Sequence, residues 1–224
     1  MNATPSRRHI LVAAFCIVPL AGCSVLRDPP AAQIYRISPM ADYPKDGQII
    51  HKRLVVDIPT APQSLDTDRI ALIRDRTRFD YYADSVWTDR VPMLLQALLV
   101  EAFENEGSIP AVGRGAETLT PDYLLKTEIR EFEARYDQDN QPPSAVVALD
   151  LSLVKMPDRQ MIGRTLITES TPAARNSVDS VVEAFDAAVG KILVRSTVWT
   201  MRLIRPAAPP HGQNGRSPTG LRAR

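Results

Sequence analysis

The chain has 224 residues, of which 27 are Lys or Arg and 26 are Asp or Glu, so its formal net charge at pH 7 is +1. Hydrophobic residues make up 44% and charged residues 24%, values that are typical of a globular domain. The balanced charge provides no basic field to hold nucleic-acid phosphates, and the length suits one domain or at most two small ones.

The N-terminus carries the pattern of an export signal. Arg7 and Arg8 precede an uncharged apolar run over residues 10–20, which is shorter than the roughly 20 residues that span a bilayer. The run ends in four residues that resemble the lipobox of bacterial lipoproteins, namely Leu20, Ala21, Gly22 and Cys23. The resemblance implies cleavage before Cys23, which then carries diacylglycerol and an N-acyl chain such as palmitate. The alternative is an ordinary secretory signal with an incidental cysteine.

A lipid on Cys23 would anchor the protein to a membrane without crossing it. Ser24, not Asp, follows this cysteine, and by analogy with other lipoproteins this predicts the periplasmic face of the outer membrane. We expect a signal peptide at 1–22, the lipidated cysteine and a tether at 23–33, a folded domain at 34–204, and a disordered tail rich in Pro and Gly at 205–224.

The first half of the expected domain contains short β-rich segments and one helix. The predicted strands are Gln33–Ile37, Arg53–Ile58, Arg69–Arg74 and Phe79–Asp84. Apolar residues then recur at helical spacing from Val91 to Phe103, with Thr88 or Asp89 as the expected N-cap. Gly107 is the expected end of this helix. A loop is predicted around Gly113 and Gly115.

Three longer strands and a second helix are predicted in the remainder of the domain. The strands are Tyr123–Arg135, Ser144–Lys155 and Ile162–Ser170, and the middle one alternates apolar and polar residues as a half-buried strand does. The helix starts at Asn176 or Ser177 and ends before Pro206. Together these elements predict a single α+β domain, in which two long amphipathic helices pack on one antiparallel sheet after a lipidated tether.

The sequence contains few residues that could perform catalysis or hold a metal. His51 and His211 are the histidines that remain after cleavage, no Gly-x-Ser-x-Gly motif is present, and no phosphate-binding Gly-x-x-x-x-Gly-Lys loop occurs. Glu131 and Glu133 lie two apart on a strand, which is more typical of a solvated face than of a glycosidase pair. We therefore predict no enzyme, no metal and no cofactor besides the covalent lipid on Cys23.

A cluster of charged and aromatic residues is the candidate docking surface. Arginines crowd the predicted hairpin at Arg69–Arg78, and nearby aspartates cancel most of their charge. The aromatic side chains that follow suit either a subunit interface or the core equally well. The candidate partner contacts are Arg69, Arg78, Tyr82 and Trp87.

Several short motifs in a fixed order carry a resemblance to a known family. After the lipobox come Tyr35–Pro39, Val56–Pro59, Leu65–Ile70, Tyr81–Pro92, Asp122–Leu125 and Ile129–Phe132. Over Ile34–Leu203 the chain resembles the ABC-type transport auxiliary lipoprotein component family. It departs from that pattern at Thr88 and Asp89, where a more apolar or acidic-proline segment is expected.

The resemblance implies a non-enzymatic accessory of a transporter. In such systems a separate ATPase and permease act with a mammalian-cell-entry (MCE) domain protein, and phospholipid or other apolar molecules move between the two bacterial membranes. The alternatives are an outer-membrane lipoprotein that regulates a peptidoglycan synthase, and a secreted hydrolase using His51. Whether the chain forms a homo-oligomer stays open.

Overall fold

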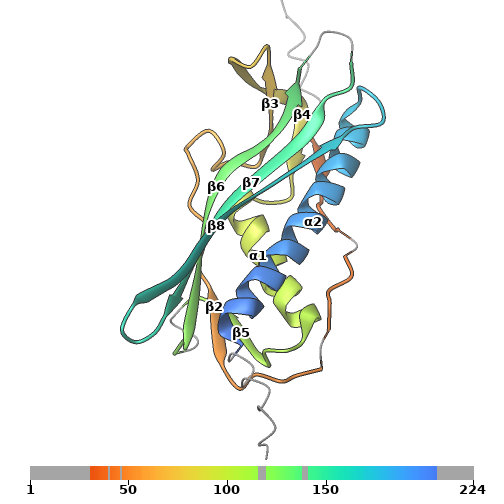
Figure 1. The fold of residues 1–224 in the computed structure, drawn as a ribbon. Coiled ribbons are helices and arrows are strands. Elements are labelled where there is room, and N and C mark those ends of the chain that lie inside the picture. The colour runs from red at the N-terminus through yellow and green to blue at the C-terminus, as the bar shows by residue number, and fades with distance from the viewer. Residues whose placement is uncertain (1–30, 40, 46, 116–119, 138–140, 206–224) are drawn as a thin grey trace, which may run out of the picture. The chain divides into compact units, whose positions relative to one another are not determined.

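A computed structural model describes residues 31–39, 41–45, 47–115, 120–137 and 141–205 (Figure 1). The chain divides into two units, Met1–Ala31 and Ala32–Arg224, and the described residues belong almost entirely to the second. The predicted signal peptide, the lipobox with Cys23, and the tail after Arg205 lie outside the described residues.

In this part of the chain, the structure contains eight strands and two helices (Figure 1). The strands are β1 Gln33–Tyr35, β2 Arg53–Val56, β3 Arg69–Arg74, β4 Arg78–Trp87, β5 Ala111–Arg114, β6 Tyr123–Tyr136, β7 Ser144–Lys155 and β8 Gln160–Pro172. The helices are α1 Val91–Glu106 and α2 Val178–Ile204. The expected α+β class and its two helices are therefore correct.

The sheet is mixed, so the expectation of one antiparallel sheet is only partly correct. β3–β4, β6–β7 and β7–β8 pair antiparallel, as hairpins require. However, β1 runs parallel to β4, β2 runs parallel to both β5 and β6, and β3 runs parallel to β6. These parallel partners are separated by long stretches of chain, and no local turn sequence indicates such a pairing.

β6 connects the β7–β8 hairpin to the other strands of the sheet. On one side it pairs with β7 along nearly its whole length. On its other side, β2 pairs with its first residues, Tyr123–Leu125, and β3 with its last, Ala134–Tyr136. An isolated bridge between Thr60 and Glu128 lies between these two pairings. The short strands β1 and β5 and the long strand β8 are consequently the edges of the sheet.

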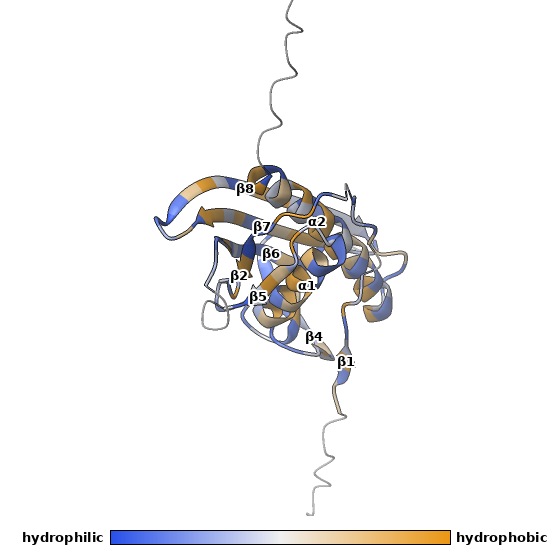
Figure 2. Cartoon of the chain, turned by 90° about the horizontal axis from the view of Figure 1, so that it is seen from below, coloured by the Kyte–Doolittle hydropathy of each residue, from blue (hydrophilic) through white to orange (hydrophobic). Residues whose placement is uncertain are grey.

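β7 follows the predicted alternation. Val147, Leu149, Leu151 and Leu153 are fully buried towards the helices, while Asp150 and Ser152 are partly exposed. Bands of hydrophobic and hydrophilic residues alternate along β7 and β8 in Figure 2. One face of this part of the sheet therefore forms the core, and the opposite face carries polar side chains.

α1 begins later than predicted, and Thr88 and Asp89 do not cap it. Its N-cap is Arg90, whose side chain makes no capping hydrogen bond. The first helical N–H, that of Val91, instead donates to the Thr67 carbonyl at 3.0 Å. Gly107 ends the helix as predicted, with a left-handed φ of 80° that glycine adopts without strain.

α2 begins as predicted at the N-cap Ser177, whose hydroxyl accepts a hydrogen bond from the Ser180 N–H. It packs closely on β8, where Gly163 lies beside Leu203 and Trp199. A β-carbon placed on Gly163 would lie 2.5 Å from Leu203 Cδ1. The absence of a side chain at this position therefore allows the helix and the strand to approach.

Three aromatic rings form the centre of the core. Trp87, Phe132 and Phe185 come from β4, β6 and α2, and each is at most 2% exposed. The ring centroid of Phe185 lies 5.2 Å from that of Trp87 and 4.9 Å from that of Phe132. These contacts hold α2 against β4 and β6. The other helix, α1, lies beside α2 on the same face of the sheet (Figure 1).

Candidate functional site

The residues considered for catalysis are not assembled into a catalytic group. His51 is exposed in the segment before β2. Glu131 and Glu133 both accept hydrogen bonds from Nη2 of Arg135, each at 2.9 Å. This shared guanidinium makes the two carboxylates an ion-pair cluster rather than an acid and base pair.

Two of the predicted partner contacts, Arg69 and Arg78, are exposed on the β3–β4 hairpin. The Arg69 guanidinium lies 3.8 Å from the centroid of the Tyr81 ring, and Arg78 forms an ion pair with Asp75. Both side chains remain accessible from solvent, so their proposed role in docking stays a prediction.

The other two predicted contacts, Tyr82 and Trp87, interact with side chains of the same domain. The Tyr82 hydroxyl lies 2.9 Å from that of Tyr136, and burial raises the pKa of Tyr82 well above its usual value. Trp87 is 2% exposed within the aromatic centre. The indole is covered by the protein's own core, so of the two roles that the sequence left open for this side chain, the structure supports the core.

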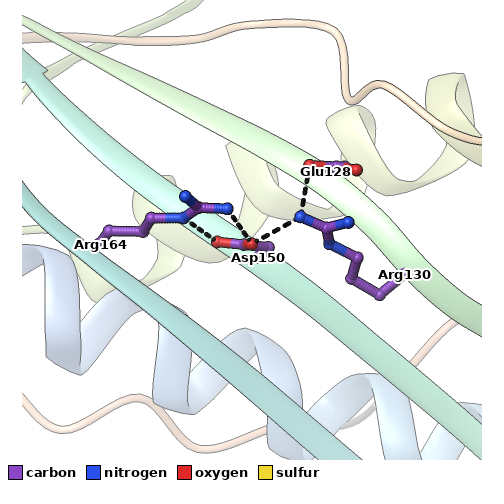
Figure 3. Close-up of polar contacts among 4 residues, drawn as sticks. All are labelled: Glu128, Arg130, Asp150 and Arg164. Carbon is purple, nitrogen blue, oxygen red and sulfur yellow. Dashed lines mark hydrogen bonds and ion pairs between the residues drawn. The ribbon is translucent and has the colours of Figure 1, made fainter.

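The strongest polar feature is a four-residue network on the sheet face opposite the helices (Figure 3). Arg130 Nη2 contacts Glu128 at 2.8 Å and Asp150 at 3.0 Å. Arg164 donates two hydrogen bonds to Asp150, from Nε at 2.9 Å and from Nη2 at 2.6 Å. Arg130 is the extra residue at an irregularity in the β6–β7 register, which turns its side chain into the network.

This network carries no net formal charge and is held by Asp150. Its carboxylate is only 11% exposed. The hydrogen bonds from Arg164 lower its pKa to about 2, and those from Arg130 act in the same direction. Asp150 therefore stays ionised at neutral pH, and its charge is used in the ion pairs with Arg130 and Arg164.

A hollow of about 470 Å³ lies next to this network on the same face. Ile73 and Phe79 form an apolar part of its lining, and Arg76 and Glu133 contribute charge. The Glu133 side chain is 5% exposed, and its burial raises the pKa of its carboxyl group. Glu131 and Glu133 in its lining already form ion pairs with Arg135.

A second concave surface lies on the other side of the sheet, along the exposed side of α2. This groove, which we call the α2–β8 groove, has a volume of about 500 Å³. Its surface is mainly apolar, from Ala187, Gly190 and Val194. Charged residues of α2 and β8 line it as well, and these are Glu169, Lys191 and Arg195.

The described residues provide neither a metal site nor a membrane-spanning helix. No group of three or more His, Cys, Asp or Glu side chains among them is placed to hold a metal ion. Neither described helix is both long and apolar enough to cross a membrane.

Comparison with known proteins identifies the family. A model of the ABC-type transport auxiliary lipoprotein component family matches residues 35–195. The chain belongs to this family. The match confirms the resemblance seen in the ordered motifs. The description of this family is that of a lipoprotein component that assists ABC-type transport.

A curated relative and two solved structures resemble this auxiliary lipoprotein. It is 30% identical over 150 residues to the uncharacterized protein bll6063 of Bradyrhizobium diazoefficiens, covering 66% of this chain and 39% of that protein. The chain thus spans about two fifths of that relative. The crystal structure of protein XCC0632 from Xanthomonas campestris has a TM-score of 0.72 at 24% identity, covering 77% of this chain and 96% of that one.

The second structure, that of an uncharacterized protein, has a TM-score of 0.60 at 13% identity, covering 76% of this chain and 99% of that one. At these identities the two structures show that the fold is shared.

Sequence reasoning missed the network and the α2–β8 groove. Glu128, Arg130, Asp150 and Arg164 come from three strands, and only the register of β6, β7 and β8 brings them together. For Asp150, the signal available in the sequence was its outward position in the alternating pattern of β7.

Proposed function

We propose that this auxiliary lipoprotein is a non-enzymatic component of an ABC transporter that includes an MCE-domain protein, a permease and an ATPase. Its role is to support the movement of phospholipid or other apolar molecules between the inner and outer membranes. The observation that carries the proposal is the family match over residues 35–195, joined to a lipobox that ends at Cys23.

The proposed anchor is a diacylglycerol and an N-acyl chain on Cys23. Each buried acyl CH₂ contributes roughly 0.8 kcal/mol to membrane binding, and more than one chain gives stable anchoring. With Ser24 next to the cysteine, we place the protein on the periplasmic face of the outer membrane. From there the domain docks on the MCE assembly.

The arrangement of charged groups supports a role without chemistry. Asp150 and Glu133, the most buried carboxylates of the sheet face, hydrogen bond to arginines. The exposed His51 has no carboxylate partner among the described residues. Hydrolysis of ATP is therefore assigned to the transporter's own ATPase subunit.

Purification of the complex tests the proposed partner. A tag placed after Pro206 allows capture from gently solubilised membranes, followed by mass spectrometry. We expect an MCE-domain protein with its permease and ATPase, well above an untagged control. Recovery of a peptidoglycan synthase without transporter subunits would instead identify the alternative function.

The anchor is tested separately by substituting Cys23→Ser. This variant should lose labelling by radioactive palmitate and should leave the membrane fraction. Cys16→Ser is the matched control, because Cys16 lies in the predicted signal peptide outside the lipobox. Equal labelling of both variants would refute the assignment of Cys23.

A further inference from the structure

The long edge strand β8 has no neighbour on its outer side in the described part of the chain. It spans 13 residues, Gln160–Pro172, and pairs only with β7 there. The other two edges, β1 and β5, have 3 and 4 residues. Exposed edges of this length are normally covered or blocked, because their free N–H and C=O groups attract further strands.

One side-chain contact shows which backbone groups of β8 point outwards. Arg195 Nη1 donates a hydrogen bond to the Thr168 carbonyl at 3.1 Å, so Thr168 presents its backbone to the free side. Alternate residues of an antiparallel strand point the same way. Arg164, Leu166 and Ser170 therefore also direct their N–H and C=O groups outwards, over roughly 20 Å of strand.

The surface beside this edge is suited to the side chains of an added strand. Leu166 is 58% exposed on the outer face of the sheet. On the opposite face the α2–β8 groove runs beside the edge, with an apolar surface from Ala187, Gly190 and Val194. A strand added to β8 would place alternate side chains on these two faces, with small or β-branched apolar residues in the groove.

The charged residues of the groove indicate which sign of charge its occupant carries. Arg195 pairs with Glu169. In the described residues, the Lys191 ammonium contacts the Thr171 hydroxyl at 3.4 Å and no carboxylate. The groove therefore has one cation in excess, which would be complemented by a carboxylate on the occupant.

From these observations we infer that β8 and the α2–β8 groove bind an extended segment of a partner protein by strand addition. The residues of this segment that face the groove are apolar except for a carboxylate near Lys191, and the residues between them lie on the outer face of the sheet beside Leu166. The tail at 206–224 is a poorer occupant, because it contains three arginines and no acidic residue. A second copy joined at β8 would add its own excess cation, Lys191, to the interface and would supply no carboxylate to complement it.

The test uses the full chain in detergent and a synthetic peptide, Thr-Asp-Thr-Val-Thr-Val-Thr-Asp-Thr, labelled with fluorescein. Its two Val and two Asp side chains share one face of the strand, so a carboxylate can lie near Lys191 in either strand direction. Binding is measured by fluorescence anisotropy, and amide hydrogen exchange is resolved to single residues. We expect saturable binding, with slower exchange at Leu166 and Ser170. Ile167 should be unaffected, because its N–H faces β7. A peptide N-methylated at alternate residues should bind at least tenfold more weakly.

Two variants and a matched control locate the binding surface. Leu166→Pro removes an outward N–H without removing a bond to β7, and Lys191→Glu reverses the unpaired charge; each should weaken binding about tenfold. Arg202→Glu makes the same kind of charge change on α2 outside the groove lining and should leave affinity unchanged. Because Lys191 is an exposed helical residue, its variant remains informative if Leu166→Pro fails to fold.

Three results would overturn the inference. The first is the absence of peptide binding, or binding that none of the variants changes. The second is slow exchange at Leu166 in the free chain that becomes fast when residues 206–224 are deleted, which would make the tail the occupant. The third is a dimer in light scattering that Leu166→Pro converts to a monomer, which would make the occupant a second copy.

Discussion

Replacing Phe185 by alanine should test whether the aromatic centre holds α2 on the sheet. The Phe185 side chain is fully buried, and its ring contacts those of Trp87 and Phe132 at centroid distances of 5.2 and 4.9 Å. Truncation of a buried phenylalanine costs about 3–5 kcal/mol of unfolding free energy, from lost transfer energy and from the cavity left behind. For a domain of this size, this loss corresponds to a Tm lower by roughly 6–20 °C.

The assay is urea and thermal unfolding followed by circular dichroism, with tryptophan fluorescence as a second probe. Phe79→Ala is the matched control, because Phe79 is 40% exposed and its ring meets that of Tyr81 edge-on. It should cost less than about 1 kcal/mol. If both variants lose similar amounts of unfolding free energy, or if Phe185→Ala lowers it by less than about 1 kcal/mol, the three rings do not form the centre of the core.

Three further substitutions probe the sheet and its helices. The pKa of Asp150 falls from 3.8 to about 2 on folding. The ionised carboxylate therefore stabilises the fold above pH 3.8, and this contribution is lost as the pH falls towards 2. Asp150→Asn should accordingly make the free energy of unfolding depend less on pH in this acid range. Gly163→Ala should lower the free energy of unfolding in urea by about 1–3 kcal/mol, because the new methyl group meets Leu203. Adding Leu203→Ala to the same chain should recover part of that loss. Gln96→Leu removes the donor that lies 3.0 Å from the buried Val56 carbonyl and should cost about 1–3 kcal/mol. An unchanged denaturation midpoint would contradict either of the last two predictions.

Elements with strong local signals were predicted well. Gly107 ends α1 and Ser177 caps α2 as expected, because left-handed backbone and N-terminal hydroxyls are local requirements of helix ends. The bounds of β3 and β7 match the prediction, since β3 is rich in strand-forming residues and β7 alternates apolar and polar ones.

Features that depend on distant partners were not predicted. β5 was expected to be part of a loop because of Gly113, yet it becomes a strand by pairing with β2. Thr88 and Asp89 lost their expected capping role to a carbonyl from Thr67. Trp87 illustrates the same limit, since an aromatic residue at the end of a strand suits an interface and a core equally well until its neighbours are known.

For the candidate surfaces, too, features with a local signal were predicted and features that depend on distant partners were not. Exposure of Arg69 and Arg78 followed from their place on a predicted hairpin. The ion-pair network around Asp150 needs the relative register of three strands, and the α2–β8 groove needs the position of a helix against an edge. Neither relation is encoded in the spacing of residues within one segment.

The position of β6 between β2 and β3 has a consequence for the order of folding. Both earlier strands take their parallel partner from residues 123–136, so the first half of the domain has no central strand until this segment is present. Contacts between residues so distant in sequence form slowly, because a long loop must close first. During synthesis from the N-terminus, β2 and β3 therefore lack their central partner until residues 123–136 have been added.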